Sequence, residues 1–109
     1  MTTKIGIKPL SVNKAWQGKR FKTKDYKQFE RDMLLMLPNV KLDFTGALKV
    51  SLKYGFSSKL SDIDNPTKMT LDILCKKYGF DDRQIFSLVQ SKEIVEKEKE
   101  FIDISISQI

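Results

Sequence analysis

The chain has 109 residues, of which 40% are hydrophobic and 31% charged, and its formal net charge is +6 at neutral pH. This length predicts one domain, residues 1–109, because a second core would not fit. The sequence has no histidine and one cysteine, Cys75, which excludes histidine-based catalysis and an internal disulfide. Any catalysis would therefore depend on carboxylates, lysine or a metal ion.

The basic residues are concentrated in the first half of the chain. Residues 1–60 carry thirteen Lys or Arg against four Asp or Glu, whereas residues 61–109 carry seven against ten. A basic surface attracts phosphate backbones, although an ordinary soluble protein can have the same net charge. No apolar run is long enough for a membrane helix and no signal peptide is evident, so we expect a cytoplasmic protein without membrane contact.

The first half predicts two strands with a helix between them. Apolar and polar residues alternate in TKIGIK, residues 3–8, which is typical of a short strand. The period changes to that of a helix after Thr23, the predicted N-cap, and Pro38 ends this helix. ALKVSLKYGF, residues 47–56, alternates again and predicts a half-exposed strand. The predicted apolar face of the helix comprises Tyr26, Phe29, Met33 and Met36.

The second half predicts a helix followed by a β-hairpin. The helix covers residues 66–78, with Asn65 as N-cap and Gly79 as a left-handed C-terminal cap. Residues 84–92 and 101–107 are predicted to pair as the strands of the hairpin. The element order β-α-β-α-β-β indicates an α+β fold, in which two helices pack on a mixed, largely antiparallel four-stranded sheet as two layers. The predicted apolar stripe of the second helix is Leu71, Leu74, Cys75 and Tyr78.

Acidic residues gather around the second helix. Asp62 and Asp64 lie two residues apart in a segment that we expect to be extended before Pro66, so their carboxylates can point the same way. Mg²⁺ takes one or two protein carboxylates and completes its shell with waters and substrate phosphate. With Asp82 as a more distant partner, these residues form a candidate metal site. Each acidic motif alone also fits a plain turn or helix cap.

Lys68 is predicted at the third position of the second helix, where the positive end of the helix dipole disfavours a cation. It is therefore expected to have an anion beside it, for which Asp62, Asp64 or a bound phosphate are candidates. Asp72, four residues later, can form an ion pair with Lys68 and hold it in place. Such pairs are also common on solvated helices without any special role.

The segment NKAWQGKRFKTK, residues 13–24, mixes basic and aromatic residues. Trp16 can stack on an unpaired base, or it can cover one end of the sheet. The basic side chains are expected to contact a nucleic-acid backbone with little sequence preference. The candidate DNA-binding residues are Lys14, Trp16, Lys19, Arg20, Lys22, Lys24 and Lys76.

The acidic segment resembles the RusA family of Holliday-junction resolvases, small Mg²⁺-dependent endodeoxyribonucleases often carried by phages and prophages. The shared pattern is Asp-x-Asp-Asn, a lysine three residues later, an aspartate four residues after that, and Asp-Asp-x-Gln before a strand. In this chain the pattern comprises Asp62, Asp64, Asn65, Lys68, Asp72, Asp81, Asp82 and Gln84.

The resemblance implies that Asp62, Asp64 and Asp82 bind Mg²⁺, for which Mn²⁺ can substitute, and that Lys68 is the essential lysine, supported by Asp72. It also implies a homodimer that cuts four-way DNA junctions in recombination and repair, since two opposed strands must be nicked by two sites. Two alternatives remain open. One is a less specific nuclease of flaps or forks from the same family, and the other is a non-catalytic phage DNA-binding or assembly protein.

Overall fold

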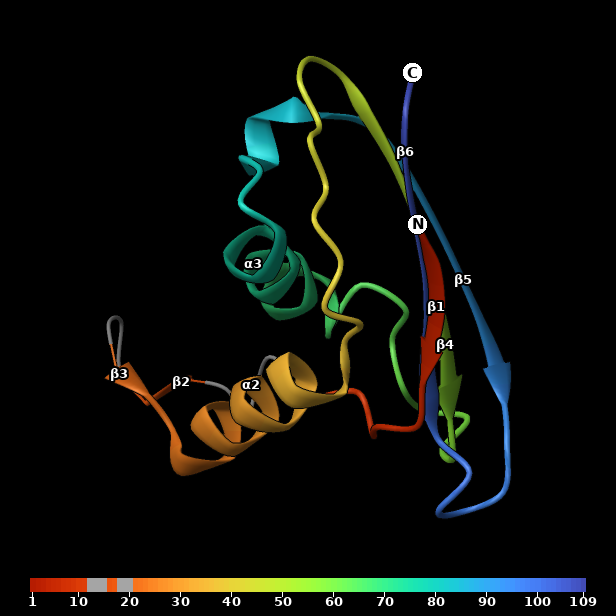
Figure 1. The fold of residues 1–109 in the computed structure, drawn as a ribbon. Coiled ribbons are helices and arrows are strands. Elements are labelled where there is room, and N and C mark those ends of the chain that lie inside the picture. Colours follow the sequence, from red (N-terminus) through yellow and green to blue (C-terminus); the bar gives the residue numbers. More distant parts are fainter. Residues whose placement is uncertain (12–15, 18–20) are drawn as a thin grey trace.

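The computed structural model of the chain describes residues 1–11, 16–17 and 21–109. Within these residues, two helices and a 3₁₀ turn accompany a four-stranded sheet and a pair of two-residue strands (Figure 1). In chain order the elements are β1 (Thr2–Ile5), β2 (Trp16–Gln17), β3 (Phe21–Lys22), α2 (Lys24–Met36), β4 (Leu48–Phe56), α3 (Thr67–Tyr78), the 3₁₀ turn η1 (Asp82–Gln84), β5 (Ile85–Ile94) and β6 (Phe101–Gln108).

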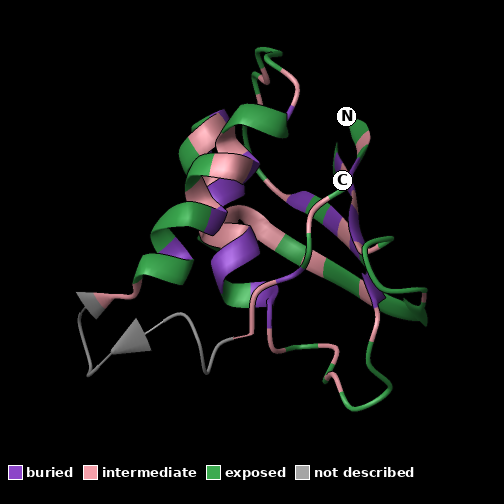
Figure 2. Cartoon of the chain, turned by 90° about the horizontal axis from the view of Figure 1, so that it is seen from below, coloured by how far each residue is buried: buried purple, intermediate pink, exposed green. Residues whose placement is uncertain are grey.

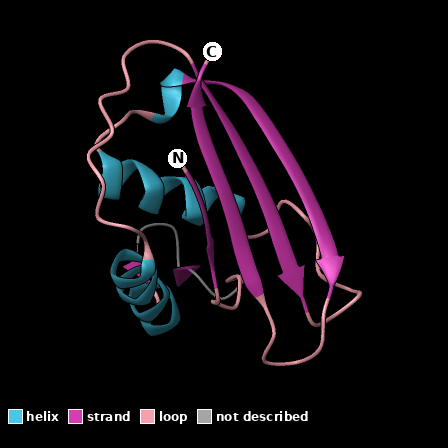
Figure 3. Cartoon of the chain, turned by 45° about the vertical axis from the view of Figure 1, so that its right-hand side comes forward, coloured by secondary structure: helices cyan, strands magenta, loops and turns pink. Residues whose placement is uncertain are grey.

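The four-stranded sheet has the order β1-β6-β4-β5. Strand β6 is antiparallel to both β1 and β4, whereas β4 and β5 are parallel. The parallel pair requires a crossover, which α3 supplies between β4 and β5. Both helices cover the same face of the sheet (Figure 3). The predicted two-layer α+β fold and its element order are confirmed.

The predicted hairpin is wrong. Strand β5 pairs with one side of β4 and β6 with the other, so β4 lies between the two strands that were expected to be neighbours. Crossing β4 requires the connection to span roughly 10 Å, twice the spacing of neighbouring strands. The residues between β5 and β6, 95–100, are long enough for this step. Alternation along a strand predicts its two faces but does not predict its partner.

The core lies between the inner face of the sheet and the two helices (Figure 2). Helix α2 begins after the predicted N-cap Thr23, whose Oγ1 accepts a hydrogen bond from the backbone N–H of Tyr26 at 3.2 Å. Met36 was predicted on the buried face of this helix but is 43% exposed, because the helix ends there and Leu37 enters the core instead. The sheet contributes the buried residues Leu48, Val50, Leu52, Tyr54, Ile102, Ile104 and Ile106.

Helix α3 starts one residue later than predicted. The carbonyl of Pro66 accepts the first helical hydrogen bond, from the N–H of Thr70 at 3.1 Å, so Pro66 and not Asn65 is the N-cap residue. The preceding residues already form turns, which delays the helix. Lys68 therefore occupies the second helical position rather than the third. The predicted C-terminal cap is confirmed, because Gly79 has a φ of 74°.

The buried face of α3 is also wider than predicted. Leu74 and Tyr78 are buried as expected, whereas Leu71 and Cys75 are only partly buried. The helix packs against both the sheet and α2, and Thr67 hydrogen-bonds to Tyr54 and Gln90 of the sheet. The backbone of α2 accepts a hydrogen bond from Lys77 through the carbonyl of Leu34 at 3.0 Å. The buried residues that the prediction missed are Thr67, Met69, Thr70 and Ile73.

No helix in the described part of the chain is both long enough and apolar enough to cross a membrane.

Candidate functional site

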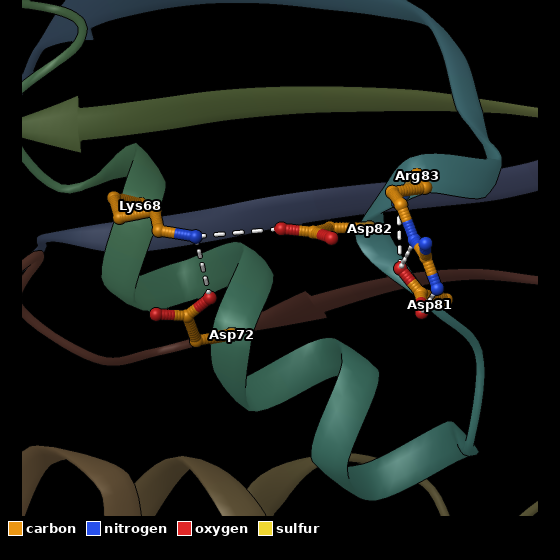
Figure 4. Close-up of polar contacts among 5 residues, drawn as sticks. All are labelled: Lys68, Asp72, Asp81, Asp82 and Arg83. Carbon is orange, nitrogen blue, oxygen red and sulfur yellow. Dashed lines mark hydrogen bonds and ion pairs between the residues drawn. The ribbon is translucent and has the colours of Figure 1, made fainter.

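Lys68 lies on the exposed side of α3 and contacts two carboxylates (Figure 4). Its Nζ lies 3.1 Å from Oδ1 of Asp72 on the same helix and 3.4 Å from Oδ2 of Asp82 in η1. The side chain of Lys68 is 65% exposed, and those of Asp72 and Asp82 are 39% and 49% exposed. We refer to these three residues as the Lys68 centre. It joins helix α3 to the turn that precedes β5.

The electrostatics of the Lys68 centre keep its lysine charged. The hydrogen bond and the charge of Asp72, with a smaller contribution from Asp82, raise the pKa of Lys68 above its usual range. These carboxylates also offset the unfavourable position of a cation near the N-terminus of α3. The expected ion pair with Asp72 is present, and Asp82 is a second anion that helix spacing alone did not predict as a partner of Lys68.

The turn η1 holds Asp82 in place through its two neighbours in the sequence. Asp81 is the N-cap of this turn, where its carboxylate accepts from the backbone N–H of Arg83 at 2.9 Å and also pairs with the Arg83 guanidinium. Gln84 accepts from the N–H of Asp81 and donates to the carbonyl of Gly46, at 2.9 and 3.1 Å. The bonds from Arg83 lower the pKa of Asp81 to about 2. Asp81 and Gln84 therefore shape the turn that carries Asp82.

Asp62 and Asp64 are exposed residues in the connection between β4 and α3. This segment is not extended as predicted. It forms turns in which the N–H of Asn65 donates to the carbonyl of Asp62 at 3.3 Å, and that of Thr67 donates to Asp64 at 3.2 Å. Residues two apart share one side only in an extended chain, so the geometric reason for pairing these carboxylates does not apply here. Asp62 instead lines a groove of about 970 Å³ between this connection, α2 and the segment after β1.

Within the ranges that the structure describes, no three or more His, Cys, Asp or Glu side chains are grouped where they could hold a metal ion. The fold thus brings Asp72 and Asp82 to Lys68 but does not gather Asp62, Asp64 and Asp82. The donors themselves suit Mg²⁺, which prefers oxygen ligands and needs only one or two protein carboxylates beside waters and substrate phosphate. The metal-ligand set stays a prediction.

A buried hydrogen-bond network lies on the opposite side of the α3 N-terminus. The hydroxyl of Thr67 is 2.9 Å from the hydroxyl of Tyr54 on β4 and donates to Oε1 of Gln90 on β5. Burial raises the pKa of Tyr54 to about 12. We call Thr67, Tyr54 and Gln90 the Thr67 network. It attaches the first turn of α3 to two strands, and nothing in the local sequence pattern predicted it, because its members lie on three different elements.

A second charged cluster joins α2 to β3 and α3. Glu30 accepts from Lys22 through Oε2 and from Lys76 through Oε1, each at 3.0 Å. Burial raises the pKa of Glu30, but the hydrogen bonds and charges of the two lysines outweigh it and lower the pKa below the usual range. We call Lys22, Glu30 and Lys76 the Glu30 cluster. The two lysines were predicted to contact DNA, whereas Glu30 was not predicted, and its signal in the sequence is its place as an acid among basic residues.

The other predicted DNA-binding residues are described only in part. Lys24 is the exposed first residue of α2. Trp16 belongs to β2, of which the structure describes the backbone. Lys14, Lys19 and Arg20 lie outside the described residues.

Comparison with known proteins gives one family. A family model described as "Endodeoxyribonuclease RusA" matches residues 8–107, which is nearly the whole chain. No curated protein matches the chain.

Proposed function

The chain belongs to the RusA endodeoxyribonuclease family, and from this premise we propose that it resolves four-way DNA junctions by metal-dependent paired phosphodiester hydrolysis. Membership of the family implies a nuclease that acts on branched DNA, and the match to residues 8–107 supports treating the chain as one nuclease domain. The observation that carries the proposal is the Lys68 centre. Lys68 and Asp82 are separated by 14 residues in the sequence, yet meet on one exposed surface.

Lys68 acts as a cation toward the scissile phosphate. Because its pKa is raised, it stays protonated at neutral pH, so it does not serve as a general base. Its exposure of 65% leaves the ammonium accessible to a phosphate oxygen. A cation in that position stabilises the negative charge that develops on the phosphate during cleavage. Asp72 positions Lys68 by its ion pair at 3.1 Å.

Asp62, Asp64 and Asp82 are the residues that would hold Mg²⁺ or Mn²⁺. A divalent cation bound there would supply a Lewis acid that activates a water and stabilises the leaving 3′ oxygen. Lys68 contacts Oδ2 of Asp82 over 3.4 Å, so a charge change at Asp82 also alters the surroundings of Lys68. Of the three proposed ligands, Asp82 is therefore the one that the structure places beside Lys68.

The direct test is cleavage of a synthetic four-way junction with and without Mg²⁺. We expect the wild-type protein to cut, and a chelator to abolish cutting. Asp64→Asn and Asp82→Asn should each lower the rate by about 100-fold or more, while junction binding stays the same or tightens because a negative charge is removed. Asp43→Asn, an exposed aspartate before β4, is the matched control and should cut normally.

Two results would contradict this assignment: a wild-type protein that cuts no junction with either metal, or Asn variants that cut as well as wild type. Binding without any cutting would support the non-catalytic DNA-binding alternative. Equal cutting of junctions, flaps and forks would instead support the less specific nuclease of the same family.

Paired cleavage requires two sites, and we propose that they come from a homodimer. Strand β5 is an edge of the sheet and carries exposed apolar side chains, including Phe86 at 75% and Val89 at 48%. An exposed apolar edge favours pairing with another chain, and a second copy can pair there across a twofold axis. Light scattering should give a dimer for wild type and a monomer for Phe86→Lys with Val89→Lys. Val40→Lys, an exposed apolar residue away from the sheet, is the control.

A further inference from the structure

We propose that the Glu30 cluster is a second phosphate-binding site, which takes a backbone phosphate of the same DNA strand that the Lys68 centre holds. The inference rests on the proposed nuclease function, because it assumes that DNA lies along α3. In this arrangement Lys22 and Lys76 bind the phosphate, and Glu30 positions them.

The cluster has a covered anion beneath two accessible cations. The side chain of Glu30 is 17% exposed, whereas those of Lys22 and Lys76 are 39% and 60% exposed. Each ammonium has three hydrogen-bond donors, and the contact with Glu30 uses one of them. The net charge of the three residues is +1, and the two lysine side chains are more exposed than that of Glu30. An anion that approaches this surface meets two ammonium groups before it meets the carboxylate.

Glu30 holds together two lysines that come from different elements. Lys22 ends β3 and Lys76 lies in the last turn of α3, and Glu30 on α2 is a common partner that links them. Lys22 has a further contact, with its Nζ 4.8 Å from the centre of the Tyr26 ring. Two like charges repel each other, and the carboxylate between them offsets this repulsion. The lowered pKa of Glu30 keeps it ionised at neutral pH.

The Glu30 cluster and the Lys68 centre lie along the same side of α3. Lys68, Asp72 and Lys76 follow one another at intervals of four residues on this helix, and positions four residues apart are neighbours on a helix surface. Lys68 and Lys76 are eight residues apart on α3, which places them about 12 Å apart along the helix axis. One strand of B-DNA has a phosphate about every 3.4 Å along its axis. Because the strand also winds around that axis, phosphates about 12 Å apart in space are about two nucleotides apart, so a strand that runs along α3 would bring the phosphate about two nucleotides from the Lys68 phosphate to the cluster.

The competing explanation is an ion-pair cluster that only links the helices. Ion pairs near the surface contribute little to stability. That role would affect the melting temperature but would leave both the salt dependence of DNA binding and the choice of contacted phosphate unchanged.

The first experiment measures junction binding without divalent metal over a range of salt concentrations. Lys76→Ala should weaken binding about 5- to 10-fold and reduce the slope of log K against log salt by about one, as expected for one lost phosphate contact. Lys97→Ala, an exposed lysine between β5 and β6, is the matched control and should bind like wild type. Identical affinity and slope for Lys76→Ala and Lys97→Ala would overturn the second site.

The second experiment locates the phosphate. A single neutral methylphosphonate is moved along the cleaved strand, one position at a time. Wild-type binding should weaken when the substitution reaches a position about two nucleotides from the cut, whereas the affinity of Lys76→Ala should fall no further with the substitution at that position. If the losses of affinity caused by Lys76→Ala and by the methylphosphonate add up when the two changes are combined, Lys76 does not contact that phosphate. This result would overturn the proposal.

The third experiment tests the positioning role of Glu30. Removing a negative charge ordinarily tightens DNA binding, so a merely electrostatic effect predicts that Glu30→Gln binds more strongly. If Glu30 positions the two lysines, Glu30→Gln should bind several-fold more weakly, and the slope of log K against log salt should also decrease. Tighter binding by Glu30→Gln would overturn this role. Failure of all three tests in a protein that still cuts junctions would reject the second site and leave the proposed function intact.

Discussion

Thr67 and Lys68 are neighbours in the first turn of α3, but their side chains lie in opposite environments. Thr67 is 8% exposed and hydrogen-bonds to Tyr54 and Gln90 in the sheet, whereas the Lys68 side chain is 65% exposed and pairs with the carboxylates of Asp72 and Asp82. Buried hydrogen bonds are costly to break, while exposed ion pairs contribute little to stability. The Thr67 network therefore attaches the first turn of α3 to the sheet, whereas the Lys68 centre provides charge at the surface.

The strongest way to test this division is to remove the exposed cation. Lys68→Ala should lower the single-turnover cleavage rate by about 100- to 1,000-fold, the range for losing one group that stabilises transition-state charge. The free energy of unfolding should change by less than about 0.5 kcal/mol, because the side chain is exposed. Lys49→Ala, on the outer face of β4, is the control for removing a surface lysine. A large drop in stability would mean that Lys68 supports the fold as well as the chemistry.

The converse test breaks the buried side. Thr67→Val keeps the shape of the side chain but removes the hydroxyl, so the buried hydroxyl of Tyr54 and the half-buried amide of Gln90 lose a partner. We expect a loss of about 1–3 kcal/mol in the free energy of unfolding, measured by urea denaturation. Thr67→Ser keeps the hydroxyl and should cost less. If Thr67→Val were as stable as wild type, the network would not be what attaches α3 to the sheet.

The smallest expected effect comes from removing the partner that lies on the same helix. Asp72→Asn should change stability by about 0.5 kcal/mol or less, as for other helix pairs four residues apart. Cutting should fall only a few-fold, because Asp82 still contacts Lys68. The pKa of Lys68, followed by NMR, should move down toward its usual range, since Asp72 is the largest cause of its increase. An unchanged pKa would show that Asp82 alone sets the state of the lysine.

Local signals in the sequence predicted the elements well. Thr23 and Gly79 act as the helix caps that their residue types indicate, because a cap depends on hydrogen bonds and backbone angles within a few residues. The pair of Lys68 with Asp72 follows from helix spacing in the same way. Asn65 failed as a cap because the turns before it delay the start of α3, which is a property of the connection and not of the residue.

Contacts between elements were harder to predict from the sequence. The sequence predicted the strand of residues 101–107 but placed it beside β5, whereas β4 separates the two strands. The Glu30 cluster was missed because it joins residues from β3, α2 and α3, and Glu30 and Lys76 are 46 positions apart in the sequence. Periodicity reports which face of an element is buried, but it contains no information on which element covers that face.

The class of fold, the caps at Thr23 and Gly79 and the residue types near α3 could be predicted from the sequence, because these depend on residue types and spacings within one or two turns. The packing of the elements was needed to show that Asp82 meets Lys68, that Thr67 is attached to two strands, and that Asp62 and Asp64 lie in turns rather than in an extended segment. Such contacts depend on how the helices and the sheet pack together, and packing is a property of the whole chain.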